Sequence, residues 1–187
     1  MSQFPRQEKP PAFSDHLRYR PFLRRDFDFR CAYCERSEAV LGGKEFFEID
    51  HFRPLAKFPD LGTHYPNLYY SCGMCNRHKS YTWPTDELLA RGFRFADPCE
   101  EDMYSEHLQE MPDGKLRALT HCGRYTCDHI RLNRPDLLLS RRDKRRAAVQ
   151  LRELEQVLRA AERDPAVREH VGAVALLIAQ LRQRYSL

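Results

Sequence analysis

Two pairs of cysteines, each spaced Cys-x-x-Cys, restrict the fold of this 187-residue chain more than any other feature. Cys31 and Cys34 form the first pair, and Cys72 and Cys75 form the second. Each pair can supply two thiolates from one tight turn, and two such turns complete a closed tetrahedral site of the kind that holds structural zinc. The spacing therefore predicts a Zn²⁺ site that joins the two ends of segment 31–75 and contributes to the free energy of folding.

The three remaining cysteines have no such spacing, although histidines lie near them in the sequence. These residues are Cys99, Cys122 and Cys127, with His107, His121 and His129. A second metal site is one interpretation of this group, and spare or buried thiols are the other. The irregular spacing favours the second interpretation.

Charge and hydropathy limit the partners and the compartment. The formal net charge is +4, which is compatible with a polyanionic partner but does not require one. The longest apolar block, residues 171–179, is too short to cross a bilayer, and the polar residues 1–11 contain no secretory signal. We therefore expect a cytoplasmic protein without membrane contact, in which the cysteines stay reduced and serve as metal ligands.

An acidic residue and a histidine adjoin each other between the two cysteine pairs. Asp50 and His51 lie among apolar residues that suit a short strand, and Pro54 ends that strand. At the end of a strand, a carboxylate can hold a divalent cation while an imidazole takes a proton from water. Such a pair is typical of phosphodiester cleavage, but alone it is weak evidence.

Two asparagines strengthen this interpretation. Asn76 follows the last cysteine of the pairs, and its side-chain oxygen suits Mg²⁺ together with Asp50. Asn67 could fix the loop that carries His51 and hold its imidazole in the useful tautomer, and Glu48 could support the metal ligands. The basic residues after Asn76 are candidates for phosphate contact, and they are Arg77, His78 and Lys79. His78 could instead be a surface residue or a substitute metal ligand.

The ordered series of these residues resembles the HNH, or ββα-metal, endonucleases. The series is Cys31-x2-Cys34, Asp50-His51-x2-Pro54, Asn67 and Cys72-x2-Cys75-Asn76-x2-Lys79. The resemblance implies a β-hairpin and a helix around one catalytic Mg²⁺ or Mn²⁺ ion. It implies that Asp50 and Asn76 bind this ion, that His51 is the general base, and that Asn67 orients the base. Asn76 stands where this family often has histidine.

A looser resemblance concerns the small HNH nucleases of bacterial anti-phage systems of the Septu type. It is carried by Cys31-Ala-Tyr-Cys34-Glu35, Asn67-Leu-Tyr-Tyr-Ser-Cys72 and Leu132-Asn133-Arg134 followed by Arg141. In such systems the nuclease pairs with an ATPase or another sensor subunit, so the resemblance implies a partner of this class.

The C-terminal part has the periodicity of helices. Apolar residues step by four and three along 147–161 and again along 167–181, and Asp164-Pro165 between them is typical of a helix start. Two antiparallel helices should result, and the wide apolar face of the second suits contact with the core or another chain. The first is preceded by a basic run that either contacts phosphate or is simply solvated: Arg141, Arg142, Lys144, Arg145 and Arg146.

These features together predict an α+β fold, with a small ββα-metal core stapled by zinc, additional helices and a C-terminal helical hairpin. We expect a nuclease domain over residues 1–140 with its core at 31–80, a β-hairpin around Pro112-Asp113-Gly114, and the helical hairpin over 141–187. The predicted function is metal-dependent hydrolysis of DNA with low sequence specificity. The alternatives are a non-catalytic zinc module that binds nucleic acid or protein, and an RNA-cleaving nuclease active only in a complex. A homodimer is also compatible with the apolar C-terminal helix.

Overall fold

The computed structural model describes residues 2–6, 10–161, 171–185 and 187, and it confirms the α+β class. The chain divides into two compact units, Met1–Leu138 and Leu139–Leu187, and each is described by itself below. Among the described residues, no helix has both the length and the apolar character needed to span a bilayer.

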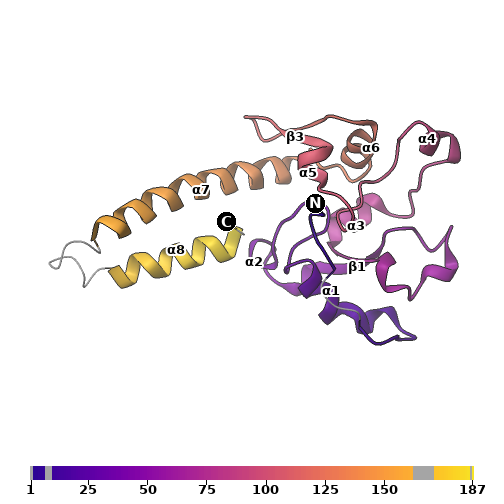
Figure 1. Ribbon diagram of the computed structural model, residues 1–187, viewed down its shortest axis with the longest axis horizontal. Coiled ribbons are helices and arrows are strands. Elements are labelled where there is room, and N and C mark those ends of the chain that lie inside the picture. Colours follow the sequence, from indigo (N-terminus) through magenta and orange to yellow (C-terminus); the bar gives the residue numbers. More distant parts are fainter. Residues whose placement is uncertain (1, 7–9, 162–170, 186) are drawn as a thin grey trace. The chain divides into compact units, whose positions relative to one another are not determined.

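The centre of the first unit is a β-hairpin followed by a short helix (Figure 1). Strand β1 (Phe47–His51) pairs antiparallel with β2 (Leu68–Cys72), in a register that sets Phe47 opposite Cys72 and His51 opposite Leu68. All five residues of β2 are buried. In β1, Phe47 and Asp50 are buried and the other three residues, including the terminal His51, are partly exposed. Helix α3 (Gly73–Lys79) begins directly after β2 and packs against both strands.

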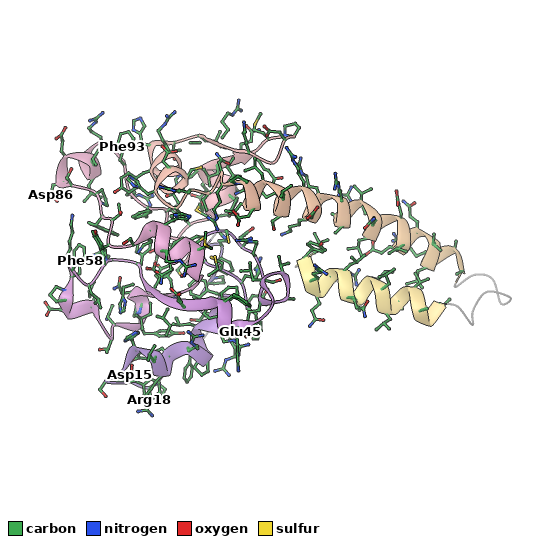
Figure 2. The ribbon with its side chains drawn as sticks, turned by 180° about the vertical axis from the view of Figure 1, so that it is seen from behind. Asp15, Arg18, Glu45, Phe58, Asp86 and Phe93 are labelled. Carbon is green, nitrogen blue, oxygen red and sulfur yellow. The ribbon has the colours of Figure 1, made fainter. Side chains whose placement is uncertain are left out.

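The N-terminal segment covers one side of this hairpin. The 3-10 helix η1 (His16–Tyr19) begins at Asp15, whose side chain accepts the Leu17 N–H, and α1 (Arg20–Asp26) continues from it and packs on β2. Figure 2 shows Asp15 and Arg18 close together at this edge. The chain between α1 and β1 forms two short elements, α2 (Glu38–Leu41) and η2 (Lys44–Phe46).

The connection from β1 to β2 forms a long loop with two single turns, η3 (Pro59–Leu61) and η4 (Tyr65–Asn67). Phe58 lies on this loop (Figure 2). Its ring meets that of Trp83 edge-on, with centroids 5.4 Å apart. Aromatic contacts of this kind tie the loop to the segment after α3.

The rest of the first unit packs a second hairpin against a helix. Its elements in order are α4 (Asp86–Ala90), α5 (Met103–Glu106), β3 (Leu108–Glu110), β4 (Leu116–Ala118) and α6 (His121–His129). Strands β3 and β4 pair antiparallel around the Pro112-Asp113-Gly114 turn, as the sequence predicts. A Cβ at Gly123 would lie 2.1 Å from the His107 carbonyl oxygen, so only glycine lets α6 approach this closely.

The second unit consists of two long helices that run side by side (Figure 1). Helix α7 (Pro135–Ala161) starts at residue 135, within the first unit, and α8 (Val171–Tyr185) returns beside it, with Arg182 Nη2 donating to Glu155 Oε1 at 2.7 Å. Among its described residues, Ala147, Leu151 and Ile178 are the buried apolar ones. The first two belong to the predicted stepping along 147–161, and Ile178 belongs to the stepping along 167–181. The expected helix start at Asp164-Pro165 and the beginning of the 167–181 stripe lie outside the described residues.

Candidate active site and metal centre

The four cysteines of the two pairs come together as the sequence predicts. Their sulfur atoms all lie within 4.8 Å of one another, and the Sγ atoms of Cys34 and Cys72 are 3.8 Å apart. A zinc ion with Zn–S bonds of about 2.3 Å has sulfurs about 3.8 Å apart at the corners of its tetrahedron. The residues present therefore fit a structural zinc ion.

Local backbone structure explains how each pair forms its turn. In the first pair, the Cys31 N–H donates to the Arg36 carbonyl at 3.0 Å, and Glu35 takes a left-handed conformation with φ 56° that lets the chain reverse. In the second pair, Cys72 ends β2 and Cys75 lies in the first turn of α3. The Ala32 N–H donates to the Tyr70 carbonyl at 2.8 Å, which attaches the first turn to β2.

Two arginines place positive charge beside the cysteine cluster. Arg134 Nη2 donates to Cys75 Sγ at 3.3 Å, and its Nε pairs with Asp136 at 3.1 Å. Asp136 also pairs with Arg36 at 2.9 Å. The pKa of Cys34 lies well below its ordinary value, because the three other thiols donate hydrogen bonds to its sulfur and Arg36 adds a positive charge. Arg134 lies 59 residues after Cys75 in the sequence, and the Leu132-Asn133-Arg134 motif that contains it did not indicate a contact with a cysteine.

A pocket of about 390 Å³ lies beside the zinc cluster, at the junction of β1 and α3. It brings together three of the predicted site residues, Asp50, His51 and Asn76, with Arg77 beside them. The other residues that line it are Ile49, Pro54, Leu55, Ala56, Ser80 and Tyr81.

His51 is held by a backbone carbonyl that the sequence did not indicate. Its Nε2 lies 2.9 Å from the Gly62 carbonyl oxygen, and because a carbonyl can only accept, Nε2 carries the proton and Nδ1 keeps its lone pair. Burial lowers the pKa of His51, although the bond to Gly62 opposes this shift, and the nearby His16 lowers it further. The His16 and His51 ring centroids are 5.1 Å apart. His51 is therefore neutral at physiological pH, as a general base requires.

Asn67 fixes the loop that supplies this carbonyl. Its Oδ1 accepts the Arg53 N–H at 2.8 Å, and its Nδ2 donates to the carbonyls of Arg53 at 3.0 Å and Leu61 at 3.4 Å. The side chain is buried, and Leu61 directly precedes Gly62. Asn67 thus acts on His51 through the loop, because it fixes the backbone next to the carbonyl that orients the imidazole.

Asp50 is buried and has two side-chain partners, one from each of the segments that carry a cysteine pair. Lys79 Nζ lies 3.0 Å from its carboxylate, and the hydroxyl of Tyr33 donates to Oδ2. Tyr33 lies between Cys31 and Cys34, so the first cysteine turn reaches this carboxylate directly. A carboxylate has about four acceptor positions, so two partners leave positions for a cation from the pocket.

Asn76 has a fixed amide orientation. Its Nδ2 donates to Glu48 Oε2 at 2.7 Å, and Arg77 Nη1 lies 3.6 Å from the other oxygen of Glu48. With its nitrogen held by Glu48, the amide has its oxygen available as a ligand. Glu48 thus supports the candidate ligand Asn76 by a direct contact.

The structure differs from the sequence expectation for one of the basic residues after Asn76. Lys79 is fully buried, and its ammonium also donates to the His51 carbonyl at 2.8 Å, so it does not face a phosphate. The reason is helical phase: Lys79 lies four residues after Cys75, on the inward face of α3. Arg77 lines the pocket, whereas His78 does not, and burial followed by the charge of Arg134 lowers the pKa of His78. The basic run of α7 lies entirely in the second unit, and its residues are Arg141, Arg142, Lys144, Arg145 and Arg146.

A second group of metal-ligand side chains is held together by an ion pair. Glu101, His107 and Cys122 lie within 4.8 Å of one another, but the Arg94 guanidinium contacts Glu101 at 2.5 and 2.7 Å. Although burial opposes the shift, hydrogen bonds from Arg94 and His107 lower the pKa of Glu101 to about 2. Burial raises the pKa of Cys122 to about 11, so its thiol stays protonated. This arrangement agrees with the interpretation as spare or buried thiols, and Cys99 and Cys127 join no such group within the described ranges.

Comparison with known proteins identifies the segment that carries the pocket. Residues 31–82 match the family model described as HNH endonuclease. No curated protein and no solved structure matches the chain significantly. The matched segment begins at Cys31, contains both strands of the central hairpin and α3, and includes every polar residue that lines the pocket. Residues 31–82 of this chain are therefore similar to an HNH endonuclease domain.

Proposed function

We propose that this chain is a metal-dependent endonuclease that hydrolyses the phosphodiester bonds of DNA. One observation carries the proposal: His51 has its Nδ1 lone pair available in the same pocket as Asp50 and Asn76. A base and two oxygen ligands in one pocket suit hydrolysis of a phosphodiester better than they suit binding alone.

The donor set of the pocket fits a hard divalent cation, Mg²⁺ or Mn²⁺. Asp50 offers carboxylate oxygens and Asn76 an amide oxygen, and two protein ligands leave positions for water and for phosphate oxygens, as is usual for Mg²⁺. When bound, such a cation would stabilise the negative charge that develops on the phosphate and on the leaving oxygen.

The chain's own residues would perform the proton transfer and the positioning. His51 would accept a proton from the attacking water at Nδ1, and the Gly62 carbonyl would hold the resulting imidazolium through the Nε2 proton. Arg77, which lines the same pocket and is largely exposed, would contact the phosphate. Glu48 would keep the amide of Asn76 in the orientation that presents its oxygen.

Binding through phosphate contacts predicts low sequence specificity and a strong dependence on salt. We propose that the basic run at the start of α7 adds such contacts, with the five residues Arg141, Arg142, Lys144, Arg145 and Arg146. The preference for DNA over RNA rests on the resemblance to HNH nucleases, because none of these groups reads a 2′-hydroxyl.

We further propose a role in bacterial anti-phage defence, in the cytoplasm and with an ATPase or sensor subunit as partner. This extension is supported by the motif resemblance and by the exposed side chains of Leu176 and Leu177 on α8, which are 61% and 43% accessible. Phage plating on cells that carry the wild-type gene with its neighbouring genes, against cells that carry the His51→Ala variant, tests it. Equal plating in the two strains would remove the defence role.

Plasmid cleavage tests the nuclease itself. Purified protein should nick DNA with Mg²⁺ or Mn²⁺, and His51→Ala should lose about 10²- to 10⁴-fold in rate, the usual contribution of a general base. His64→Ala is the matched control, because His64 lies exposed on the loop that follows His51 and β1, and it lines no part of this pocket. Bound zinc measured in all three proteins shows that the fold is intact. Undiminished cleavage by His51→Ala would reject the assignment, and RNA cleavage without DNA cleavage would reassign the substrate.

A further inference from the structure

We propose that the candidate active-site pocket also binds an unstacked nucleobase against the ring of Tyr81, so that the substrate is a single-stranded or locally opened stretch of nucleic acid. The inference rests on the proposed function, because it assigns a phosphate to the polar residues of the same pocket. It adds a second binding element, which the family match does not assign.

Eight of the ten residues that line the pocket divide by chemistry into two sets, and the other two are Ile49 and Ser80. The polar set, which suits a phosphate and a cation, is Asp50, His51, Asn76 and Arg77. The apolar set, called here the apolar wall, is Pro54, Leu55, Ala56 and Tyr81. A nucleotide has the same division, with a charged phosphate at one end and an apolar base face at the other. The volume of about 390 Å³ lies within the range of roughly 300–1,000 Å³ that small-molecule ligands occupy.

Tyr81 is the most accessible member of the apolar wall. Its exposed fraction is 75%, above that of every other exposed large apolar side chain that the structure describes. Within the described residues, its ring meets no other aromatic ring, and its hydroxyl has no side-chain partner. The neighbouring Leu55 is 41% exposed, so the wall presents an open apolar surface next to charged groups. An accessible aromatic ring beside a phosphate site is the arrangement on which nucleobases stack.

The backbone that presents Tyr81 is held in an unusual conformation. Ser80 has φ 49° and ψ −141°, and the Thr82 N–H donates to the Lys79 carbonyl at 3.1 Å. This is a tight turn whose first central residue normally is glycine, because a side chain there is strained. A strained residue persists where the surrounding structure determines it, and here the fully buried Lys79 precedes the turn. The turn leads the chain out of α3 and places Ser80 and Tyr81 at the pocket.

The state of the nucleic acid follows from the geometry of stacking. In a duplex both faces of each base are covered by the neighbouring bases, so an aromatic side chain reaches a face only where the strand is open. Access of a base to Tyr81 therefore selects single strands, flaps or opened segments. Phosphate contacts alone would make no such selection.

Binding of short strands to the full-length His51→Ala protein tests the inference without cleavage. The probes are a single-stranded oligothymidylate and a strand of equal length whose bases are all replaced by abasic sugars. Tyr81→Ala should weaken binding of the base-bearing strand roughly 5- to 100-fold, the effect of removing one stacking side chain, and should leave binding of the abasic strand unchanged. Tyr81→Trp should retain or strengthen binding of the base-bearing strand.

Phe46→Ala is the matched control, because Phe46 is a 56% exposed aromatic residue that does not line the pocket. Equal losses on both probes, or no loss on either, would overturn the inference, as would an absence of binding to the base-bearing strand. The plasmid assay separates the two proposals. If the protein cleaves DNA but Tyr81→Ala does not change binding, only the base site is rejected. If binding depends on the bases but no DNA is cleaved, only the nuclease proposal is rejected.

Discussion

Replacement of Lys79 by methionine should destabilise the protein far more than the loss of a surface charge would. The Lys79 ammonium is fully buried and contacts the carboxylate of Asp50 at 3.0 Å and the carbonyl of His51 at 2.8 Å. Its Nζ also lies 5.7 Å from the centroid of the Phe95 ring. Methionine keeps most of the apolar stem, so the change removes mainly the charge.

The magnitude follows from what is left behind. Asp50 is only 4% exposed, and without the ammonium its carboxylate would keep a single side-chain partner, the hydroxyl of Tyr33. Removal of one partner of a buried ion pair costs about 3–5 kcal/mol, because the other charge stays buried and uncompensated. For a protein of this size, each kcal/mol shifts Tm by about 2–4 °C, so Tm should fall by about 6–20 °C.

Thermal and urea unfolding followed by circular dichroism measure this loss. Lys115→Met is the control, because Lys115 is 62% exposed and its 3.8 Å pair with Asp113 lies at the surface, where a change should stay within about 0.5 kcal/mol. Adding Asp50→Asn to Lys79→Met removes the uncompensated charge and should recover part of the stability. A loss below about 1 kcal/mol in Lys79→Met, or a double variant less stable than the single one, would refute the reasoning.

Two further predictions concern the zinc cluster and the general base. Arg134→Gln removes the 3.3 Å bond to Cys75 Sγ and should lower zinc affinity by about 10- to 100-fold, which is measured as faster zinc transfer to a colorimetric chelator. Arg124→Gln changes an exposed residue on α6 and should have no effect on zinc transfer. Equal zinc retention in both variants would contradict the role of Arg134. Because burial lowers the pKa of His51, kcat/KM for DNA should be constant near neutrality and fall with decreasing pH, with a midpoint below the ordinary histidine pKa of about 6.5; a midpoint above 7 at saturating Mg²⁺ would show that another group titrates.

The sequence was sufficient for the parts of the site whose residues are close together in the chain. The two Cys-x-x-Cys turns need only four residues each, and the strand that carries Asp50 and the helix that carries Asn76 follow from local patterns. The cysteine cluster, the β-hairpin and the following helix were predictable for this reason. The hairpin at residues 108–118 was predictable from its Pro-Asp-Gly turn in the same way.

Contacts made by the long loop between the strands could not be predicted. The carbonyl of Gly62 binds His51 from eleven residues away, and no residue type marks a backbone carbonyl as a partner. The inward position of Lys79 was also not predicted. A helix of seven residues is too short for its apolar pattern to show which face each basic residue takes. Helical phase relative to Cys75 could have indicated it, since the two residues are one turn apart.

The cysteine cluster and the candidate active site are connected by shared side chains and shared backbone segments. Tyr33, which lies between the first two cysteines, reaches the Asp50 carboxylate, and α3, which begins with the second pair, carries Asn76 and the Lys79 that neutralises Asp50. Tyr33 in the first cysteine turn and Lys79, one helical turn after the second, thus hold Asp50 in place. A closed site of four sulfurs leaves no position for a substrate, so its contribution to catalysis can only be to fix these turns relative to one another. The cysteine cluster and the proposed cation site therefore share one framework, and loss of a zinc ion from the cluster should displace Asp50 and Asn76.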